Sequence, residues 1–359
     1  MAVAFHPLTV CDVRRETPDS VSIAFAVPPA LAEDYRYVPG QHLTLRTRLN
    51  GEEVRRSYSI CSGLDDSELR IAVKKVEGGV FSPFAAEDIR IGDKLDVMTP
   101  QGRFGVAPEA GSARTYLAIA AGSGITPVMS IARTVLRREP QSRFVLIYGN
   151  RDSQNIIFKQ PLEDLKDRYL ARFVVHHVLS REPQEVPLLH GRIDGEKVSQ
   201  ILRTLGPLDA VDHVFLCGPG GLIEEARAAV VRLGIPAERL HIEYFSVDGL
   251  PVEVRPKPRV VKAGEAPVAV AAITLHGAHH EVPVQAGETI TDAGLRAGLE
   301  MPYSCRGGMC CTCRAKLTDG HVEMDLNYSL EKWETEAGYV LTCQSHPTTA
   351  KVSLDFDAV

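Results

Sequence analysis

Four cysteines in the last quarter of the chain have the spacing of an iron–sulfur ligand set. Cys305, Cys310 and Cys313 follow the pattern C-x4-C-x2-C, and 29 residues separate Cys313 from Cys343. This is the plant-type spacing for a 2Fe-2S cluster, whose two irons need four thiolates. One tight loop supplies three of them, and a distant anchor supplies the fourth. The sequence therefore predicts a one-electron redox centre with these four cysteines as ligands.

The residues between the cysteines bear on the choice of metal. Gly307 and Gly308 let the loop wrap closely and aim N–H groups at the sulfurs, while Arg306 can offset negative charge. A structural zinc site is the alternative, but zinc sites usually pair two short hooks of similar form. Cys311 is expected to be a small buried residue and not a ligand.

Two glycine turns precede predicted helices, where phosphate groups are often bound. Gly78-Gly79-Val80-Phe81-Ser82 leads into the helix-like FSPFAAEDI, and Gly122-Ser123-Gly124-Ile125-Thr126-Pro127 follows the strand TYLAIAA. Glycine permits close approach of the backbone, and a helix N-terminus offers N–H groups to a pyrophosphate. A strand-to-helix turn without a ligand is the alternative for the second segment.

Two further motifs accompany these turns. Arg56-Ser57-Tyr58-Ser59 closes a predicted strand about 20 residues before the first turn, and Cys217-Gly218-Pro219-Gly220 follows a later apolar strand. The first motif is weak alone, because arginine and tyrosine occur on many strands. Its weight comes from the glycine turn that follows it.

Together these segments resemble the ferredoxin–NADP reductase superfamily. The resemblance implies that Arg56 binds the FAD pyrophosphate, that Tyr58 stacks on the isoalloxazine and that Ser59 hydrogen-bonds the flavin edge. The residues that it implies at the FAD phosphates are Gly79, Val80 and Ser82. FMN is the alternative, because phthalate dioxygenase reductase-like proteins share the Arg-x-Tyr-Ser element, but GGVFS looks more like the FAD type.

The same resemblance implies a pyridine-nucleotide site. Cys217 is expected to position the nicotinamide rather than act as a nucleophile, and Phe245 to cover the flavin. Tyr58, Ser59 and Cys217 are thus the expected catalytic residues. The implied nucleotide contacts are Gly122, Gly124, Thr126, Pro127, Cys217, Gly218 and Pro219.

Three residues bear on the choice between NADPH and NADH. An acid near the ribose 2′ position favours the hydroxyl, whereas arginine accommodates a phosphate. Arg151 ends one predicted strand segment, and Ser180 and Arg181 end the next. They could equally be solvated loop residues. We expect NADPH to be preferred.

The secondary-structure elements that position these motifs follow three different sequence patterns along the chain. Up to residue 107, short alternating runs such as HLTLRTRL, RRSYSICS, LRIAVKKV and KLDVMTP, with a hairpin turn at Asn50-Gly51, predict an antiparallel β-barrel for FAD. Residues 108–247 alternate apolar strands (TYLAIAA, RFVLIYGN, RFVVHHVLS, HVFLCGP) with helical patterns, which predicts a parallel α/β sheet for NAD(P).

The last part of the chain is separated by a proline-rich stretch. Residues 248–267 contain four prolines and are expected to form a semi-stiff linker. Residues 268–359 predict a compact α+β unit, which the resemblance makes a β-grasp ferredoxin domain. This unit carries 12 Asp and Glu against 6 Lys and Arg, so it holds the whole net charge of −6. That balance disfavours nucleic-acid binding and favours charge-guided docking to a protein partner.

The order of the three predicted domains suits a protein that converts two-electron transfer into one-electron transfer. A nicotinamide gives two electrons to flavin, flavin can release them singly, and a 2Fe-2S cluster carries one. Stretches such as NGEEVRRSYSIC, YLAIAAGSGITPVMSI and GYVLTCQSHP resemble the family of reductase subunits of bacterial phenylacetyl-CoA epoxidase complexes. That resemblance implies a di-iron oxygenase as partner. A reductase for another aromatic-ring or steroid hydroxylase, or a flavin and iron–sulfur redox sensor, are the alternatives.

Location follows from what the sequence lacks. The longest mostly apolar stretch, 117–132, is interrupted by glycine and proline, and the N-terminus has no basic end followed by an apolar block. We therefore expect a cytoplasmic protein that binds neither membranes nor nucleic acid.

Overall fold

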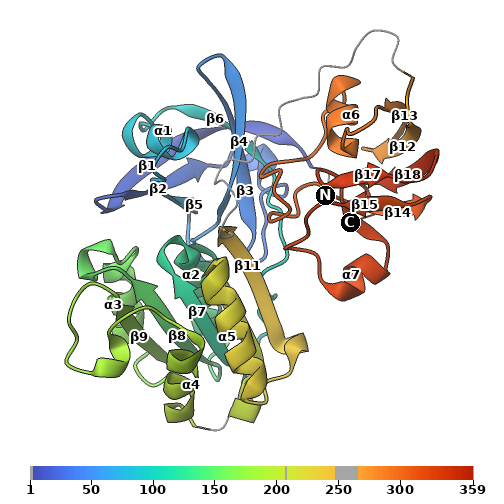
Figure 1. Ribbon diagram of the computed structural model, residues 1–359. Coiled ribbons are helices and arrows are strands. Elements are labelled where there is room, and N and C mark those ends of the chain that lie inside the picture. Colours follow the sequence, from blue (N-terminus) through green and yellow to red (C-terminus); the bar gives the residue numbers. More distant parts are fainter. Residues whose placement is uncertain (1–2, 207, 247–265, 359) are drawn as a thin grey trace. The chain divides into compact units, whose positions relative to one another are not determined.

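The computed structural model describes residues 3–206, 208–246 and 266–358, which form two compact units (Figure 1). The larger unit holds residues 5–54 and 58–246. The smaller holds residues 266–358 with 3–4 and 55–57. Most of the predicted linker, residues 248–265, lies outside the described residues.

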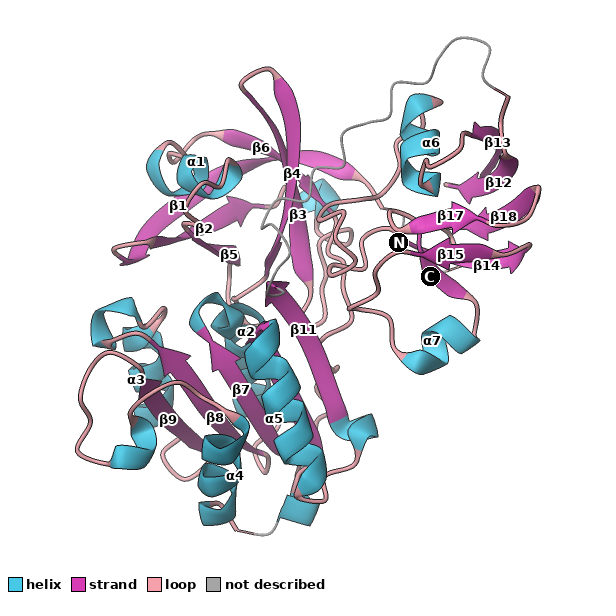
Figure 2. Cartoon of the chain, in the orientation of Figure 1, coloured by secondary structure: helices cyan, strands magenta, loops and turns pink. Residues whose placement is uncertain are grey.

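The larger unit begins with a six-stranded antiparallel sheet in the order β4-β3-β6-β1-β2-β5. An isolated antiparallel bridge between Ile60 and Ile71 joins the two edges, so the sheet closes into the predicted barrel. Strands dominate this part of Figure 2. Its elements are β1 (Phe5–Thr17), β2 (Ser20–Ala26), β3 (His42–Leu49), β4 (Glu52–Ser59), β5 (Leu69–Lys74), α1 (Phe81–Glu87) and β6 (Lys94–Met98).

The turn between β3 and β4 explains how this hairpin forms. Asn50 and Gly51 have φ of 52° and 82°, and a two-residue hairpin turn of type I′ needs positive φ at both positions. Asparagine and glycine tolerate that conformation best, so the hairpin predicted at this dipeptide is confirmed. Its consequence is functional, because β4 carries the Arg56–Ser59 motif.

The second part of the larger unit is a five-stranded parallel sheet in the order β11-β10-β7-β8-β9, as the apolar runs predict. Its strands are β7 (Thr115–Ala121), β8 (Arg143–Asn150), β9 (Phe173–Leu179), β10 (His213–Pro219) and β11 (Leu240–Ser246). Its helices are α2 (Ile125–Arg138), α3 (Lys159–Arg168), α4 (Gly195–Thr204) and α5 (Gly220–Arg232).

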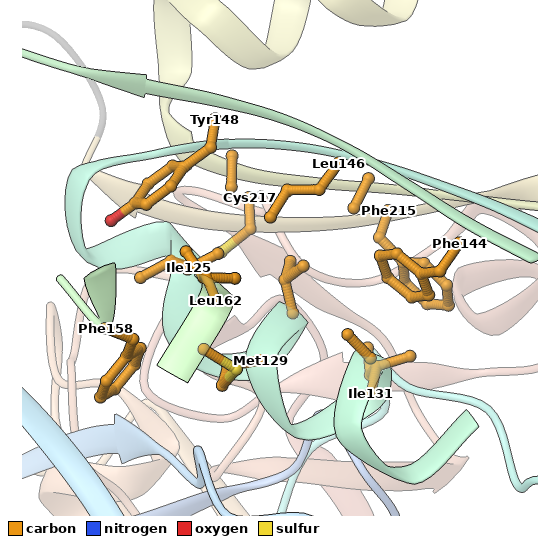
Figure 3. Packing of buried hydrophobic residues seen from close by; sticks show 14 of the residues in the cluster. Ile125, Met129, Ile131, Phe144, Leu146, Tyr148, Phe158, Leu162, Phe215 and Cys217 are labelled. Atoms are coloured by element: carbon orange, nitrogen blue, oxygen red, sulfur yellow. The ribbon is translucent and has the colours of Figure 1, made fainter. Parts of the chain in front are cut away.

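Helices cover both faces of this sheet. Alternate residues of β7 point to opposite sides: Tyr116 and Ala118 pack in the core with α2 and α3, while Leu117 and Ile119 pack with α4 and α5. Figure 3 shows the first core, with Ile125 and Met129 of α2 below the aromatic and aliphatic side chains of the sheet. Burial on both faces is why these strands are continuous apolar runs.

The smaller unit is an α+β domain built on a sheet of order β13-β12-β18-β14-β16, in which β12 and β18 run parallel. Helix α6 begins after Thr289, whose hydroxyl accepts a hydrogen bond from Asp292 N as an N-cap. The elements are β12 (Ala269–Leu275), β13 (Ala278–Val284), α6 (Ile290–Arg296), β14 (Arg314–Asp319), β15 (Val322–Met324), α7 (Lys332–Glu336), β16 (Tyr339–Leu341), β17 (Ser345–Pro347) and β18 (Lys351–Asp355).

Several local features differ from the sequence patterns. Helix α2 begins at Ile125, inside the glycine motif rather than after it, because the last three residues of that motif are themselves helical. The long β1–β2 hairpin and helix α4 add elements that the patterns did not single out. No helix among the described residues has the length and apolar character needed to span a membrane.

Candidate flavin, nucleotide and cluster sites

The carboxyl ends of β7 and β10 meet at one edge of the parallel sheet, the edge where such sheets bind ligands. Gly124 lies so close to β10 that a Cβ there would stand 2.2 Å from the carbonyl oxygen of Cys217. Only glycine fits. Thr126 donates from Oγ1 to the carbonyl of Ser123 at 3.0 Å and is buried. Thr126 thus stabilises the turn itself.

Cys217 and Glu243 are register partners on β10 and β11, and a barrel residue joins them. Ser59 Oγ lies 3.4 Å from Glu243 Oε2, and the same oxygen lies 3.9 Å from Cys217 Sγ. Burial, together with the Glu243 carboxylate, raises the pKa of Cys217 well above its ordinary value. The thiol is therefore neutral at physiological pH, in agreement with a positioning role.

The predicted flavin turn follows β5. Tyr58 packs its ring against Phe81, with centroids 5.5 Å apart, and is partly buried on the barrel core. A Cβ on Gly79 would lie 2.9 Å from Ser82 Oγ, so the turn needs glycine here. Ser82 Oγ accepts a hydrogen bond from Val76 N at 3.0 Å, which closes the turn.

The remaining flavin residues are placed by their elements. Arg56 lies on β4 two residues before Tyr58, so both side chains leave the same face of the strand. Arg56 Nη1 donates to the backbone carbonyl of Arg55 at 2.7 Å. Val80 immediately precedes α1. Because α1 has only seven residues, backbone N–H groups rather than a long helix dipole are what this turn can offer a phosphate.

A charged cluster lies where the barrel meets the end of β8. Asp19, on the β1–β2 turn, contacts Arg151 Nη2 at 2.7 Å and Lys74 Nζ at 3.7 Å through Oδ2. Burial, aided by the charge of Arg151, lowers the pKa of Lys74. A Cβ on Gly122, which has φ of 55°, would lie 3.7 Å from the Lys74 ammonium. Lys74 thus borders the glycine turn.

Unpaired donors lie at the end of β8. Asn150 is 9% exposed, and its Nδ2 has no hydrogen-bond partner among the described residues; the same holds for buried Arg151 Nε. Backbone bonds bring the next strand alongside, because Ser180 N donates to the Asn150 carbonyl at 2.9 Å and Arg181 N to that of Arg151 at 2.7 Å. Buried N–H groups without partners suit a ligand rich in oxygen, so these residues fit a nucleotide.

The four predicted cluster cysteines converge in two pairs. The thiols of Cys305 and Cys310 lie within hydrogen-bonding reach of each other, as do those of Cys313 and Cys343. The Cys305 thiol lowers the pKa of Cys310 to about 6, and the Cys313 thiol lowers that of Cys343. Over the described part of the chain no three His, Cys, Asp or Glu side chains surround a single metal position. Two sulfurs per metal is the arrangement that a two-iron cluster requires.

The loop backbone supports this arrangement. Gly307 N donates to Cys305 Sγ at 3.4 Å, and Gly308 has φ of 74° with Leu326 O 2.9 Å from where a Cβ would stand. Gln344 Nε2 donates to the carbonyl of Arg306 at 2.7 Å and lies 3.5 Å from Cys343 Sγ. The donor set and its N–H groups therefore fit a 2Fe-2S cluster.

Two other loop residues have partners of their own. Arg306 forms an ion pair with Asp292 at 2.9 Å, so its charge is balanced within the domain. Cys311 is partly buried, and its Sγ lies 3.6 Å from the carbonyl of Ser329. Burial raises the pKa of Cys311 to about 12, which leaves it a neutral thiol.

Three family models match consecutive parts of the chain. They are an oxidoreductase FAD-binding domain over residues 7–105, an oxidoreductase NAD-binding domain over 118–228 and a 2Fe-2S iron-sulfur cluster binding domain over 273–348. One of the subunits of the 1,2-phenylacetyl-CoA epoxidase of Escherichia coli is 47% identical over 99% of this chain and 98% of its own length. The chain belongs to the ferredoxin–NADP reductase superfamily, in the branch with a C-terminal 2Fe-2S domain.

Other members of this branch agree with that assignment. The ferredoxin reductase component of 3-ketosteroid-9-alpha-monooxygenase from Rhodococcus rhodochrous is 34% identical over 97% of this chain and 96% of its own. Among solved structures, phthalate dioxygenase reductase covers 98% of both chains, with 25% identity and a TM-score of 0.60. The chain is thus an oxidoreductase of the type that serves as the reductase component of oxygenases, with FAD, NAD(P) and 2Fe-2S domains.

Some of the predicted motif residues lie close together in the structure, and others do not. Ser59, Cys217, Gly124 and Gly218 lie around one sheet edge. Phe245 is partly buried and packs against the core that β7 shares with α2.

Sequence reasoning missed Glu243 as a site residue, and it missed Asp19, Lys74 and Asn150. The sequence could have pointed to Glu243 as a site residue, because an acid is unusual in the terminal strand LHIEYF. Asp19 had none, because only the folded barrel carries it to Arg151.

Proposed function

We propose that this protein takes electrons from NADPH and passes them through FAD and the 2Fe-2S cluster to an oxygenase. The observation that carries the proposal is the junction of Ser59, Glu243 and Cys217, where the end of a barrel strand meets the carboxyl edge of the nucleotide-binding sheet. A flavin and a nicotinamide can approach each other only at such a junction.

The residues have separate tasks in this proposal. Arg56 neutralises the FAD pyrophosphate, Tyr58 provides an aromatic face for the isoalloxazine, and Ser59 offers a hydroxyl to its edge. The backbone of Gly79, Val80 and Ser82 faces the FAD phosphates. Gly79 keeps this turn compact, because a side chain there would meet Ser82 and Val76.

The nucleotide is proposed to lie along the carboxyl edge of the parallel sheet. The turn Gly122–Pro127 and the segment Cys217–Pro219 bound its phosphates and nicotinamide, and Phe245 borders the ring. The neutral Cys217 thiol fills space beneath the nicotinamide and excludes water. When bound between these residues, FAD would supply two-electron acceptance from the nicotinamide and one-electron release.

The second half of the pathway rests on the cysteine pairs. Cys305 with Cys310, and Cys313 with Cys343, are the proposed ligands of the two irons. Residues 268–359 form the proposed ferredoxin domain after an FAD-binding domain (1–107), a nucleotide-binding domain (108–247) and a linker (248–267). Visible absorption with an iron and sulfide assay on the purified protein tests the ligand set. A colourless protein containing zinc contradicts it.

The proposed electron acceptor is a di-iron oxygenase of the phenylacetyl-CoA epoxidase type. The support is the 47% identity to the protein from the Escherichia coli epoxidase over nearly the whole of both chains. Reconstitution with candidate oxygenases, following product from phenylacetyl-CoA, tests it. Turnover with a steroid hydroxylase instead would favour the second candidate, which the 34% identity to 3-ketosteroid-9-alpha-monooxygenase reductases supports.

Preference for NADPH over NADH is proposed from three residues at the strand ends. Arg151, Ser180 and Arg181 are adjacent through backbone hydrogen bonds and offer two guanidinium groups to a 2′-phosphate. The kcat/KM values for ferricyanide reduction with each nucleotide test this, and equal values contradict it. We place the protein in the cytoplasm, where both nucleotides are available.

A further inference from the structure

Asp19 lies on the turn between β1 and β2, and its carboxylate reaches the nucleotide-binding part of the same compact unit. Oδ1 accepts hydrogen bonds from the hydroxyls of Thr17 at 2.8 Å and Ser20 at 3.2 Å. These bonds anchor the carboxylate from the barrel side. Oδ2 is then directed to Arg151 Nη2 at 2.7 Å and Lys74 Nζ at 3.7 Å.

The ion pair between Asp19 and Arg151 lies at a strand end that bears on coenzyme choice. Arg151 directly follows β8, the neighbour of the strand that leads into the Gly122–Pro127 turn. In dinucleotide-binding sheets an acid near this strand end selects the ribose 2′-hydroxyl, and an arginine accommodates a 2′-phosphate. Here both groups are present, but the acid comes from the barrel and is paired with the arginine.

The pairing has an electrostatic consequence. A 2′-phosphate drawn to Arg151 must also approach the Asp19 carboxylate, and like charges at such distances repel. Burial opposes ionisation, but the hydrogen bond from Thr17 and the charges of Lys74 and Arg151 hold the pKa of Asp19 below its usual value, so the carboxylate stays charged. A ribose hydroxyl carries no charge and does not experience this repulsion.

Resting on the proposed function, we propose that Asp19 is a selectivity residue that limits the preference for NADPH by occupying Arg151. Arg181, which is exposed beside Arg151, remains the main cation for the 2′-phosphate. The barrel, and not only the nucleotide-binding domain, therefore sets coenzyme choice.

The test compares NADPH and NADH as donors for ferricyanide reduction by the FAD-loaded full chain. Asp19→Asn keeps an oxygen for Thr17 and Ser20 but removes the charge. We expect the kcat/KM ratio of NADPH to NADH to rise about five- to tenfold, through a lower KM for NADPH, as loss of one charge repulsion predicts. The NADH values should change less than about twofold.

Asp65→Asn is the matched control. Asp65 is also a barrel acid paired with an arginine of the nucleotide-binding part, Arg138, at 2.9 Å, but this arginine ends α2 rather than β8. Its ratio should equal that of the native protein. In the Arg151→Gln background the effect of Asp19→Asn should vanish, because the two residues act as a pair.

The results distinguish failure of the selectivity inference from failure of the proposed function. An unchanged ratio in Asp19→Asn, or the same rise in Asp65→Asn, overturns the inference. If neither nucleotide reduces FAD in the native protein, the proposed function fails instead. If the Asp19→Asn protein does not retain FAD, inhibition of the NADH reaction by 2′,5′-ADP replaces this test. Arg151→Gln should then weaken binding of 2′,5′-ADP less than Arg181→Gln does. The reverse order overturns the inference.

Discussion

The cluster loop and the nucleotide edge are built in opposite ways. Three of the four proposed cluster cysteines lie within nine residues. Contacts beside the fourth, Cys343, join it to them, because Thr342 donates to the carbonyl of Cys313 from both N and Oγ1. At the nucleotide edge, Asp19, Ser59, Cys217 and Glu243 come from four separate segments that meet only in the folded unit. A redox site can thus be encoded by local spacing or by tertiary packing, and the two respond differently to substitution.

The largest expected effect comes from a substitution that removes the cluster and leaves the nucleotide edge unchanged. Cys310→Ser should abolish the cluster absorption and the bound iron, because serine supplies no thiolate for that pair. Ferricyanide reduction by NADPH should remain within about twofold of native, since it needs only the flavin half. Cys311→Ser should keep the cluster. An intact 2Fe-2S spectrum in Cys310→Ser would falsify the ligand assignment.

Gly124→Ala should do the converse. The added methyl meets the Cys217 carbonyl at 2.2 Å, and overpacking of this kind costs about 1–3 kcal/mol. The KM for NADPH should therefore rise about 10- to 100-fold by steady-state assay, with the cluster spectrum unchanged. Ser123→Ala, in the same turn, is the control and should behave as native. An unaltered KM in Gly124→Ala would contradict close packing at this turn.

A smaller effect tests how local the cluster site is. Gln344→Leu removes the amide N–H near Cys343 Sγ, and hydrogen bonds to sulfur raise cluster potentials. We expect the midpoint potential to fall by roughly 59 mV, which is a tenfold change for one electron. A redox titration followed by EPR measures it. Ser345→Ala, whose hydroxyl donates to Leu341 O, is the control. No shift would mean that the amide does not reach the sulfur.

The smallest expected effect concerns pH. Burial and Glu243 raise the pKa of Cys217, so its thiol remains neutral below about pH 9 and only loses its proton above that. Stopped-flow rates of flavin reduction should therefore show no step from this thiol between about pH 6 and 9, and Cys217→Ser should have a profile of the same shape. A step that disappears in Cys217→Ser would argue for a reactive thiolate.

The contrast between the two sites also explains what sequence patterns could predict. Strands such as TYLAIAA and HVFLCGP match β7 and β10 residue for residue, because burial on both faces leaves a continuous apolar run. The cysteines and glycines were recognisable for the same reason: spacing and backbone conformation are local properties. The confirmed fold follows from such local signals.

What patterns could not predict depends on packing between distant segments. Nothing around Asp19 in the sequence distinguishes it from other turn acids, and its partner Arg151 is 132 residues away. Ser82 fits the flavin pattern, yet its hydroxyl also closes a turn by accepting from Val76 N. Gly124 packs against β10, and this contact between a turn and a distant strand lies outside any single sequence window.

The contact between Gly124 and the carbonyl of Cys217 has a mechanical consequence. The glycine turn after β7 packs directly on β10, and β7 and β10 are themselves paired in the sheet. In the proposed function, one packed contact would therefore place both the phosphate at the glycine turn and the ring above the thiol. In that proposal, the distance between the phosphate and the reacting ring of a dinucleotide is set by the backbone of these two strands.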